Sequence, residues 1–232
     1  REFQNNLIKV QVNDQNYGAA VSRNIGINKS NYKFLAFLDS DDYWQPTKLE
    51  KQIKKFMCNH QLDLVYCDQF LVKDGKILKS DKTMIKSDIL DNLTNFWTAP
   101  NPSTLLFKKE SLLKLGGFDT EVGRSCSDHY LWFKMAINNF KIDFVNEPLS
   151  YFFLDSSDRN SYNLTNRLNS AKILLKKVKK YISKKKFYIF KSKYILAVTT
   201  PIFFREMKKK NYLILIKIYM QYLIFNIFFY KK

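Results

Sequence analysis

The stretch FLDSDDYW, residues 37–44, is the most informative part of this 232-residue sequence. It overlaps the end of an apolar run at residues 33–38 that is typical of a β-strand. Three carboxylates follow within four positions, at Asp39, Asp41 and Asp42. In open α/β sheets, ligands bind outside the carboxyl ends of the strands. We therefore expect an α/β fold with a ligand site where this strand ends.

Carboxylates this close repel one another, and burying them without a cation would raise a pKa or lower stability. A hard divalent cation, Mg²⁺ or Mn²⁺, that also binds substrate phosphates would relieve the repulsion, because such cations take oxygen ligands. The alternative is a solvated acidic turn that caps a helix beginning near Pro46, since Asp and Ser are common helix caps.

Outward from this stretch, short apolar runs alternate with helical patterns as far as about residue 153. The patterns predict strands at residues 7–12, 33–38, 63–68, 70–72, 103–107, 144 and 151–153, a hairpin turn at Asp74-Gly75, and helices at residues 17–29, 46–60, 109–115 and 127–139. This alternation predicts an α/β sandwich around a mostly parallel sheet. From residue 163 onward the pattern is helical only, so we expect two units, at residues 1–160 and 161–232.

The net charge of +18 is concentrated at one end of the chain. Residues 163–232 contain 18 basic residues and one acidic residue, whereas residues 1–162 contain 21 basic and 20 acidic residues. Taken as a whole, the charge would suggest a polyanion partner. Its distribution instead indicates a nearly neutral body, which holds every chemical motif, and a basic, aromatic tail.

The cysteines and histidines argue against a disulfide scaffold and against a zinc site. The sequence holds three cysteines, Cys58, Cys67 and Cys126, without pairing or metal-ligand spacing, and two histidines. This usage is typical of a reducing compartment, so we expect a cytoplasmic protein. No cleavable leader is visible, but the sequence opens on Arg1 rather than Met, so its start is expected to be missing.

Four segments resemble, in order, the motifs of the family 2 glycosyltransferases, which have the GT-A fold. Residues 38–42, LDSDD, are similar to the D-x-D motif, and residues 16–24, NYGAAVSRN, to the N-x-G-x-x-x-x-R-N segment before it. Residues 102–107, PSTLLF, resemble the acceptor-side strand. Residues 116–119, GGFD, followed by Asp128, resemble the G-G-F-D and E-D pair. Together these motifs cover residues 7–153.

The resemblance implies a donor site around the acidic stretch. Asp39 would contact the ribose of the nucleotide or support the metal, and Asp41 would hold Mg²⁺ or Mn²⁺ on the diphosphate. Arg23 would lie near the diphosphate, and Gly18 would allow the backbone to approach closely. Asp42 could cap or support the site. Without the family match, Arg23 could equally be a surface residue of a helix.

The resemblance also implies a base and an acceptor side. Asp128 corresponds to the second acid of the E-D pair, the general base of an inverting transfer, while Ser127 replaces the first acid. Asp128 falls in the first turn of a predicted helix, so helix capping is the structural alternative. Thr104 and Asp119 would face the acceptor, although Asp119 could simply form a turn.

Compared with the family, this sequence resembles a GT-A three-layer α/β/α sandwich whose first strand-helix-strand unit lies upstream of residue 7. The missing part would amount to about 60–80 residues. We expect the fragment alone to bind nucleotide poorly or not at all. No Q-x-x-R-W motif follows Asp128, which favours single sugar addition over processive synthesis.

The tail carries a dense set of lysines at residues 172–186 and an apolar stretch of 19 residues, 212–230. This stretch could just span a bilayer, but Lys217 and Gln221 fall on one face, which favours a helix lying in an anionic membrane surface. The flanking lysines at 208–210 and 231–232 would meet the headgroups. Alternatively, the helix packs on its own domain or forms a dimer contact. We expect no nucleic-acid partner, because no recognised module accompanies the lysines.

These observations predict a metal-assisted, inverting glycosyltransferase. Its donor would be a nucleotide-sugar, a UDP-sugar above all, and its acceptor a glycan or a lipid-linked glycan at the inner face of the cell membrane, as in lipopolysaccharide or capsule synthesis. One rival is a nucleotidyltransferase, which would need a Gly-rich phosphate loop that the sequence lacks. Another is a basic membrane- or nucleic-acid-binding protein whose acidic stretch is structural.

Overall fold

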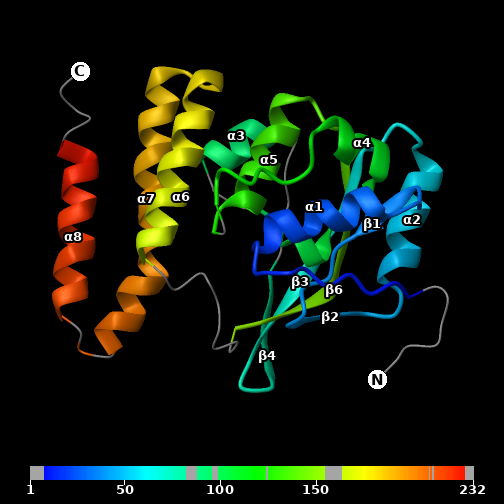
Figure 1. Ribbon diagram of the computed structural model, residues 1–232, viewed down its shortest axis with the longest axis horizontal. Coiled ribbons are helices and arrows are strands. Elements are labelled where there is room, and N and C mark those ends of the chain that lie inside the picture. The colour runs from blue at the N-terminus through cyan, green and yellow to red at the C-terminus, as the bar shows by residue number, and fades with distance from the viewer. Residues whose placement is uncertain are drawn as a thin grey trace.

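A computed structural model of the protein describes residues 8–81, 88–95, 99–123, 125–154, 164–208, 210 and 212–227. A sheet with helices on both of its faces forms one part of the molecule, and three further helices stand beside it at one end (Figure 1). The predicted combination of an α/β body and a C-terminal helical region is confirmed.

The sheet has six strands, with the order β1-β5-β3-β6-β2 and with β4 paired to β3. The strands are β1 (Phe34–Ala36), β2 (Asp42–Trp44), β3 (Leu64–Lys73), β4 (Lys76–Asp81), β5 (Leu106–Lys108) and β6 (Ile142–Phe153). The longest strands, β3 and β6, lie side by side at its centre, and β1 and β2 lie at its two ends. Residues 37–41 of the acidic stretch connect these two end strands, and its last three residues form β2.

The prediction of a mostly parallel sheet is wrong. Among the described residues, only β3 and β6 pair in parallel, and the other four pairings are antiparallel. Two local features explain this. The tight turn at Asp74-Gly75, where both residues have positive φ, returns the chain directly alongside β3 as β4. A 3₁₀ turn at Pro102–Thr104 precedes β5, which enters between β1 and β3 in the opposite direction.

The helices of the body are α1 (Ala19–Lys29), α2 (Lys48–Cys58), α3 (Ile89–Asn95), α4 (Lys109–Lys114) and α5 (Ser127–Ile137). All but α3 lie within predicted helices, and Gly116 and Gly117, both with positive φ, follow α4.

The predicted strand at residues 7–12 is wrong over its described part, 8–12, which forms no strand and exposes Ile8, Val10 and Val12. No described strand lies beyond β1 to pair with it.

Three other predicted strands have different bounds. Residues 70–72 continue β3, and residues 144 and 151–153 both belong to β6. Residues 102–104 form the 3₁₀ turn, so only the end of the predicted strand 103–107 is extended. Strand β2, which begins within the acidic stretch, was not expected, because its charged and aromatic residues follow no alternating pattern.

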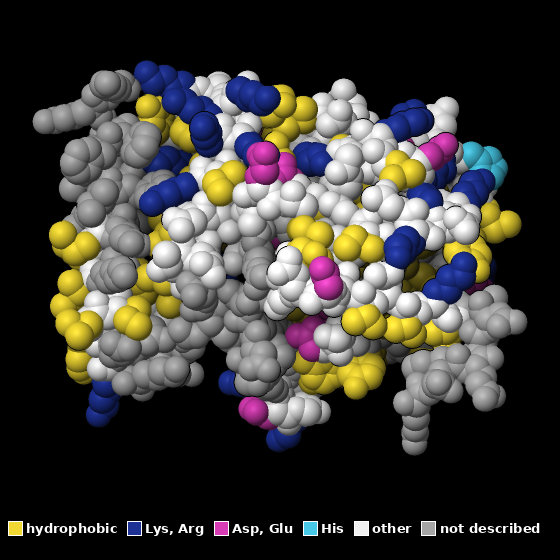
Figure 2. All heavy atoms as spheres, viewed as in Figure 1, with side chains coloured by type: hydrophobic (Ala, Val, Ile, Leu, Met, Phe, Trp, Pro, Cys, Tyr) yellow, Lys and Arg dark blue, Asp and Glu magenta, His cyan; other side chains and the backbone are white. Residues whose placement is uncertain are grey.

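The C-terminal helices are α6 (Leu164–Val178), a 3₁₀ turn at Lys179–Tyr181, α7 (Lys184–Lys208) and α8 (Tyr212–Ile227). They stand in a row, with α8 at the outer end of the molecule (Figure 1). Hydrophobic side chains line the outer edge of α8 (Figure 2). Within the described part of the chain, none of the helices is both long enough and apolar enough to cross a membrane. The side chains of Lys217 and Gln221, on which the predicted orientation at a membrane surface depended, are not among those that the structure describes.

Alternate side chains of β3 divide the core between the two faces of the sheet. Leu64 and Tyr66 face the larger cluster, formed with α1, α4 and α5, whereas Val65 and Cys67 face a smaller cluster beneath α2. This alternation follows from the period of two along a strand. The result is the predicted three-layer sandwich, in which α2 forms one outer layer.

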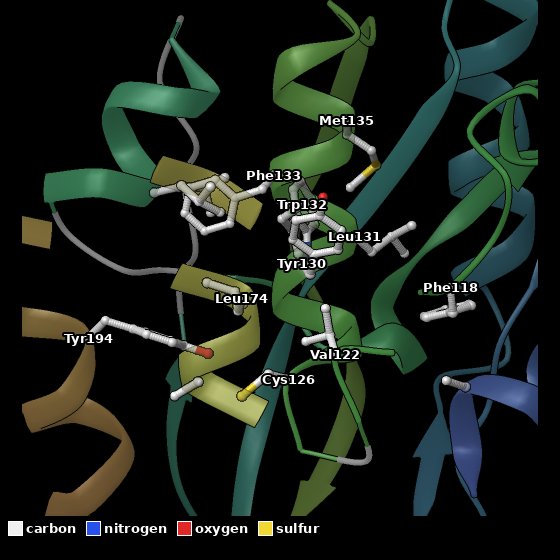
Figure 3. Close-up of a cluster of buried hydrophobic side chains, with 14 of the residues drawn as sticks. Phe118, Val122, Cys126, Tyr130, Leu131, Trp132, Phe133, Met135, Leu174 and Tyr194 are labelled. Carbon is white, nitrogen blue, oxygen red and sulfur yellow. The ribbon is translucent and has the colours of Figure 1, made fainter. Parts of the chain in front are cut away.

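The larger cluster continues without interruption into the C-terminal helices. Tyr130, Trp132 and Phe133 of α5 belong to the same cluster as Leu174 of α6 and Tyr194 of α7 (Figure 3). The predicted boundary between residues 160 and 161 itself lies outside the described residues. The basic tail is therefore joined to the body by shared apolar packing on α5.

Helix α2 buries an ionisable side chain against the sheet. Lys48 is fully buried, its Nζ donates to Gln52 Oε1 at 2.9 Å, and Nζ lies 4.2 Å from the centroid of the Trp44 ring. Gln52 in turn donates to the carbonyls of Val65 and Thr104, at 3.0 and 2.8 Å. Burial lowers the pKa of Lys48 from 10.5 to about 8. The amide of Gln52 thus ties α2 to β3 and to the 3₁₀ turn.

We predict that Lys48→Met raises the free energy of unfolding by about 1–3 kcal/mol near neutral pH, because it removes a buried charge. Between the folded pKa of about 8 and the ordinary 10.5, the unfolded chain binds more protons, so the stability contributed by Lys48 rises with pH. The advantage of the variant should therefore shrink across that range. Urea unfolding at several pH values measures it, with exposed Lys185→Met as the control. A difference that does not change with pH would contradict the prediction.

Candidate active site

The acidic stretch forms a tight turn between β1 and β2. The Asp42 amide donates to the Asp39 carbonyl at 3.0 Å, and this bond closes the turn. The three carboxylates differ in exposure, since Asp41 is exposed, Asp39 is half-buried and Asp42 is buried. The turn therefore presents Asp41 to solvent while it fixes its two acidic neighbours.

Two segments far apart in the sequence hold Asp39. The Arg23 guanidinium of α1 donates to its Oδ1 in an ion pair. From the other side, the Asp39 amide donates to Ser103 Oγ at 3.1 Å. The Arg23 guanidinium also lies 5.2 Å from the centroid of the Phe118 ring. Arg23 thus joins the acidic turn to the loop that follows α4.

The neighbouring Asn24 makes a second connection to the same loop. Its Nδ2 donates to the Phe118 carbonyl and its Oδ1 accepts from the Phe118 amide, both at 2.8 Å. Gly117 has φ +61, and a Cβ there would collide with Asn24 Oδ1. Lys134 of α5 donates to the Gly117 carbonyl at 2.8 Å. Parts of all four predicted motif segments, around Arg23, Asp39, Ser103 and Phe118, are therefore brought together.

Gly18 begins α1 in a backbone conformation that suits only glycine. Its φ and ψ are 85° and 166°, and its amide donates to Asn16 Oδ1 at 3.0 Å. The amides of the first turn of α1 follow directly. Gly18 therefore sets where the helix that carries Arg23 begins.

The region of the 3₁₀ turn supplies two further residues: Asn101, which the sequence did not single out, and Ser103, which belonged to a motif segment but had no role assigned to it. Asn101 Nδ2 donates to Asp42 Oδ2 at 3.4 Å, and Asn101 Oδ1 accepts from the Ser103 amide at 2.9 Å. The Ser103 carbonyl accepts from Trp44 Nε1 at 2.6 Å. An Asn before a Pro is a known helix-start signal, and it could have identified this turn instead of a strand.

Thr104 and Asp119 are both engaged within the protein. Thr104 is buried, and its hydroxyl donates to the Asn101 carbonyl at 2.7 Å. The Glu121 and Val122 amides donate to Asp119 Oδ1, each at 3.0 Å, and Lys177 of α6 donates to Oδ2 at 2.7 Å. Partial burial acts to raise the pKa of Asp119, but these hydrogen bonds outweigh it and hold the pKa below its usual value. This geometry is that of a turn residue, and the acceptor-side role stays a prediction.

Asp128 lies in the first turn of α5, as predicted, and is half-buried. Its Oδ1 accepts from the His129 amide at 2.9 Å. This hydrogen bond keeps the Asp128 carboxylate within α5. Its neighbours belong to a cluster that joins α5 to the C-terminal helices.

This cluster centres on Tyr194 of α7, which is buried. Its hydroxyl is hydrogen-bonded to His129 Nδ1 at 3.2 Å and to the Cys126 thiol, and Figure 3 shows it extending from α7 towards Cys126. Burial raises the pKa of Tyr194 well above its usual value, raises that of Cys126 to about 12, and lowers that of His129 despite the nearby Asp128 carboxylate. At neutral pH the imidazole is therefore uncharged.

The donor set around the turn fits a metal that takes most of its ligands from substrate and water. Across the described residues, no group of three or more His, Cys, Asp or Glu side chains gathers into a closed metal site. Asp39 is already paired with Arg23, whereas Asp41 is exposed. Mg²⁺ is commonly bound through one or two carboxylates plus substrate phosphates, and this arrangement meets that requirement.

Comparison with protein families matches residues 3–188 to the family described as "Glycosyltransferase like family 2". This match extends over most of the chain and includes all four motif segments. The chain belongs to this family. The resemblance drawn from the motifs is thus confirmed, and the match continues through α6 to the start of α7.

Individual glycosyltransferases show the same relationship. An uncharacterised glycosyltransferase of Methanocaldococcus jannaschii is 30% identical over 165 residues, which are 69% of this chain and 54% of that protein. The Escherichia coli protein WfgD, named a UDP-Glc:alpha-D-GlcNAc-diphosphoundecaprenol beta-1,3-glucosyltransferase, is 35% identical over 77 residues, 33% of this chain and 30% of its own. The chain thus spans 54% and 30% of these two relatives.

Among solved structures, S. aureus TarS 1–349 in complex with UDP has a TM-score of 0.53 at 17% identity. The match covers 79% of this chain and 52% of that one. This likeness shows a common fold and confirms the predicted GT-A type.

We predict that Gly117→Ala lowers the free energy of unfolding by about 2–4 kcal/mol, because it combines left-handed backbone strain with displacement of the Asn24 amide. Gly75→Ala is the matched control. Gly75 has a similar φ of +72, but nothing lies near its Cβ. It should lose only about 1–2 kcal/mol. Urea unfolding measures both variants, and equal losses would show that the contact with Asn24 contributes nothing.

A second prediction concerns the cluster around Tyr194. Tyr194→Phe should lower the free energy of unfolding by about 1–3 kcal/mol, because His129 and Cys126 lose a hydrogen-bond partner inside the core. Tyr212→Phe makes the same chemical change at an exposed position and should have no measurable effect. Thermal unfolding compares them, and an unchanged melting temperature for Tyr194→Phe would contradict the prediction.

Proposed function

We propose that this chain is part of a glycosyltransferase that transfers a sugar from a nucleotide-sugar donor to an acceptor hydroxyl in the synthesis of a cell-surface polysaccharide. The observation that carries the proposal is the acidic turn. It lies at the carboxyl end of β1, fixes Asp39 through Arg23 and Ser103, and presents Asp41 to solvent. Membership of the glycosyltransferase family supports it.

For the donor, we propose a UDP-sugar bound at the acidic turn. The name of the Escherichia coli relative specifies UDP-Glc, and the TarS structure holds UDP. In this chain, the exposed Asp41, supported by Asp39, would hold Mg²⁺ or Mn²⁺. The cation would neutralise the charge that develops on the departing nucleoside diphosphate. Arg23 sets the position of Asp39 through their ion pair, and its charge suits a site near the diphosphate.

For the chemical step, we propose that Asp128 is the general base of an inverting transfer. The first turn of α5 favours the carboxylate form, because the helix dipole places positive charge there. As the acceptor oxygen attacks the anomeric carbon, Asp128 would take the proton of that hydroxyl while the bond to the diphosphate oxygen breaks. Lys134, also on α5, donates to the Gly117 carbonyl. It thus ties this helix to the loop after α4, in which the Phe118 backbone contacts Asn24.

For the acceptor, we propose a glycan, either free or lipid-linked, that is modified at the inner face of the cell membrane. The name of the Escherichia coli relative specifies a diphosphoundecaprenol-linked sugar as its acceptor. Thr104 and Asp119 are the acceptor-side residues proposed from the motifs.

The experiment uses the longer protein that contains this chain and measures release of UDP from UDP-sugars with Mn²⁺ and a polyprenyl-linked acceptor. Asp41→Asn and Asp128→Asn should each lower turnover by a factor of about 10²–10⁴. Asp74→Asn, in the β3–β4 turn, is the matched control, because Asn tolerates the positive φ of that position. It should retain full turnover.

Two further readouts separate the roles. Asp41→Asn should weaken the dependence on Mn²⁺ concentration, whereas Asp128→Asn should leave donor binding unchanged and remove the lower pH limb of the rate profile. If Asp41→Asn and Asp128→Asn turn over the donor as fast as Asp74→Asn, the acidic turn and α5 do not perform this chemistry.

A further inference from the structure

The outer side of α8 carries a set of exposed apolar side chains, here called the α8 patch. Its members are Tyr212, Leu213, Ile216, Tyr219 and Met220. Leu213 is 82% exposed, which is far more than a packed helix normally allows a leucine. Figure 2 shows hydrophobic side chains along this edge of the molecule, where α8 stands farthest from the sheet.

The patch continues into a pocket between α7 and α8. The pocket has a volume of about 290 Å³, and its lining includes Leu196, Phe204 and Tyr219, all more than half exposed. On the inner side, Ile218 is 5% exposed and anchors α8 against α7. Thus α8 uses one face to pack on its own chain and leaves a second apolar face, with an apolar pocket at its margin, open to solvent.

Positive charge accompanies this apolar surface on the C-terminal helices, mostly on α6 and at the start of α7. The C-terminal helices expose lysines at positions 172, 176, 179, 180, 184, 185, 193 and 210, and residues 163–232 contain one acidic residue against 18 basic ones. Lys177 and Lys186 form ion pairs with acidic residues of the body. The charge balance of residues 163–232 nevertheless makes this end of the molecule strongly cationic.

We propose that α7 and α8 bind the surface of an anionic lipid bilayer, with the α8 patch inserted at the boundary between headgroups and acyl chains and an acyl chain in the pocket. At such a surface, burial of apolar side chains adds to the attraction between lysines and anionic headgroups. A second copy of the chain would cover the patch but would bring like charge against like charge. A nucleic acid would meet the lysines but would leave the apolar patch in water.

With α7 and α8 on the bilayer, the body would stay in the aqueous phase, because the sheet lies on the other side of α6 from α8 (Figure 1). The surface proposed here lies outside the proposed transferase site and needs neither donor nor turnover.

The experiment measures sedimentation of the full chain with vesicles of phosphatidylcholine alone and of phosphatidylcholine mixed with phosphatidylglycerol. The chain should bind the mixed vesicles at least about tenfold more tightly, and added salt should weaken this binding. Leu213→Asp/Ile216→Asp should lower the affinity for mixed vesicles at least about tenfold. Both positions are exposed, so the fold should persist, which circular dichroism verifies.

The matched control is Met57→Asp/Leu113→Asp. It introduces the same two carboxylates at exposed apolar positions of α2 and α4, on the opposite side of the body from α8. This variant should keep its affinity within about twofold. Three results would overturn the proposal: equal binding to both kinds of vesicle, equal losses in the two variants, or a dimer in solution that Leu213→Asp/Ile216→Asp dissociates. Vesicle binding without transferase activity would leave the proposal intact, so the two proposals fail separately.

Discussion

The ion pair between Arg23 and Asp39 is the constraint on which the arrangement of the site depends. Both side chains are partly withdrawn from water, so loss of either would leave an unpaired charge in a confined place. Arg23 stands one residue before Asn24, whose side-chain amide is hydrogen-bonded to both the backbone N–H and the carbonyl of Phe118. A single turn of α1 therefore sets the acidic turn and the loop after α4 relative to each other. Polar side chains therefore fix the positions of these two segments, and the apolar core packs beneath them.

The sequence predicted those parts of the site that depend on residue type and on order along the chain. The carboxylates at the end of an apolar run and the glycines after α4 could be recognised because each has a local physical cause. The partners of these residues could not. Ser103 lies 64 positions from Asp39, and the pairing depends on a 3₁₀ turn that replaced an expected strand. Nothing in the spacing of Asn101 indicates that its side chain reaches Asp42.

The fold shows the same division. Helices with an apolar face were found within a few residues of their bounds, because the period of 3.6 is a local property. Strand direction is not local. The run that becomes β5 looks the same whichever way it enters the sheet, and only the turn at Pro102–Thr104 decides that it runs against β1 and β3. Likewise, the change in charge balance near residue 163 marks no break in packing, since Leu174 and Tyr194 continue the core of α5.

The positions of the three cysteines in the fold determine which of them a reagent can modify. Cys67 and Cys126 are buried, and burial raises the pKa of their thiols to about 11 and about 12. Cys58, at the end of α2, is exposed. Because the reactive form of a cysteine is the thiolate, a maleimide reagent should modify Cys58 selectively. The native chain therefore carries its own attachment point for a fluorophore, at the end of helix α2, which lies across the body from the C-terminal helices in Figure 1.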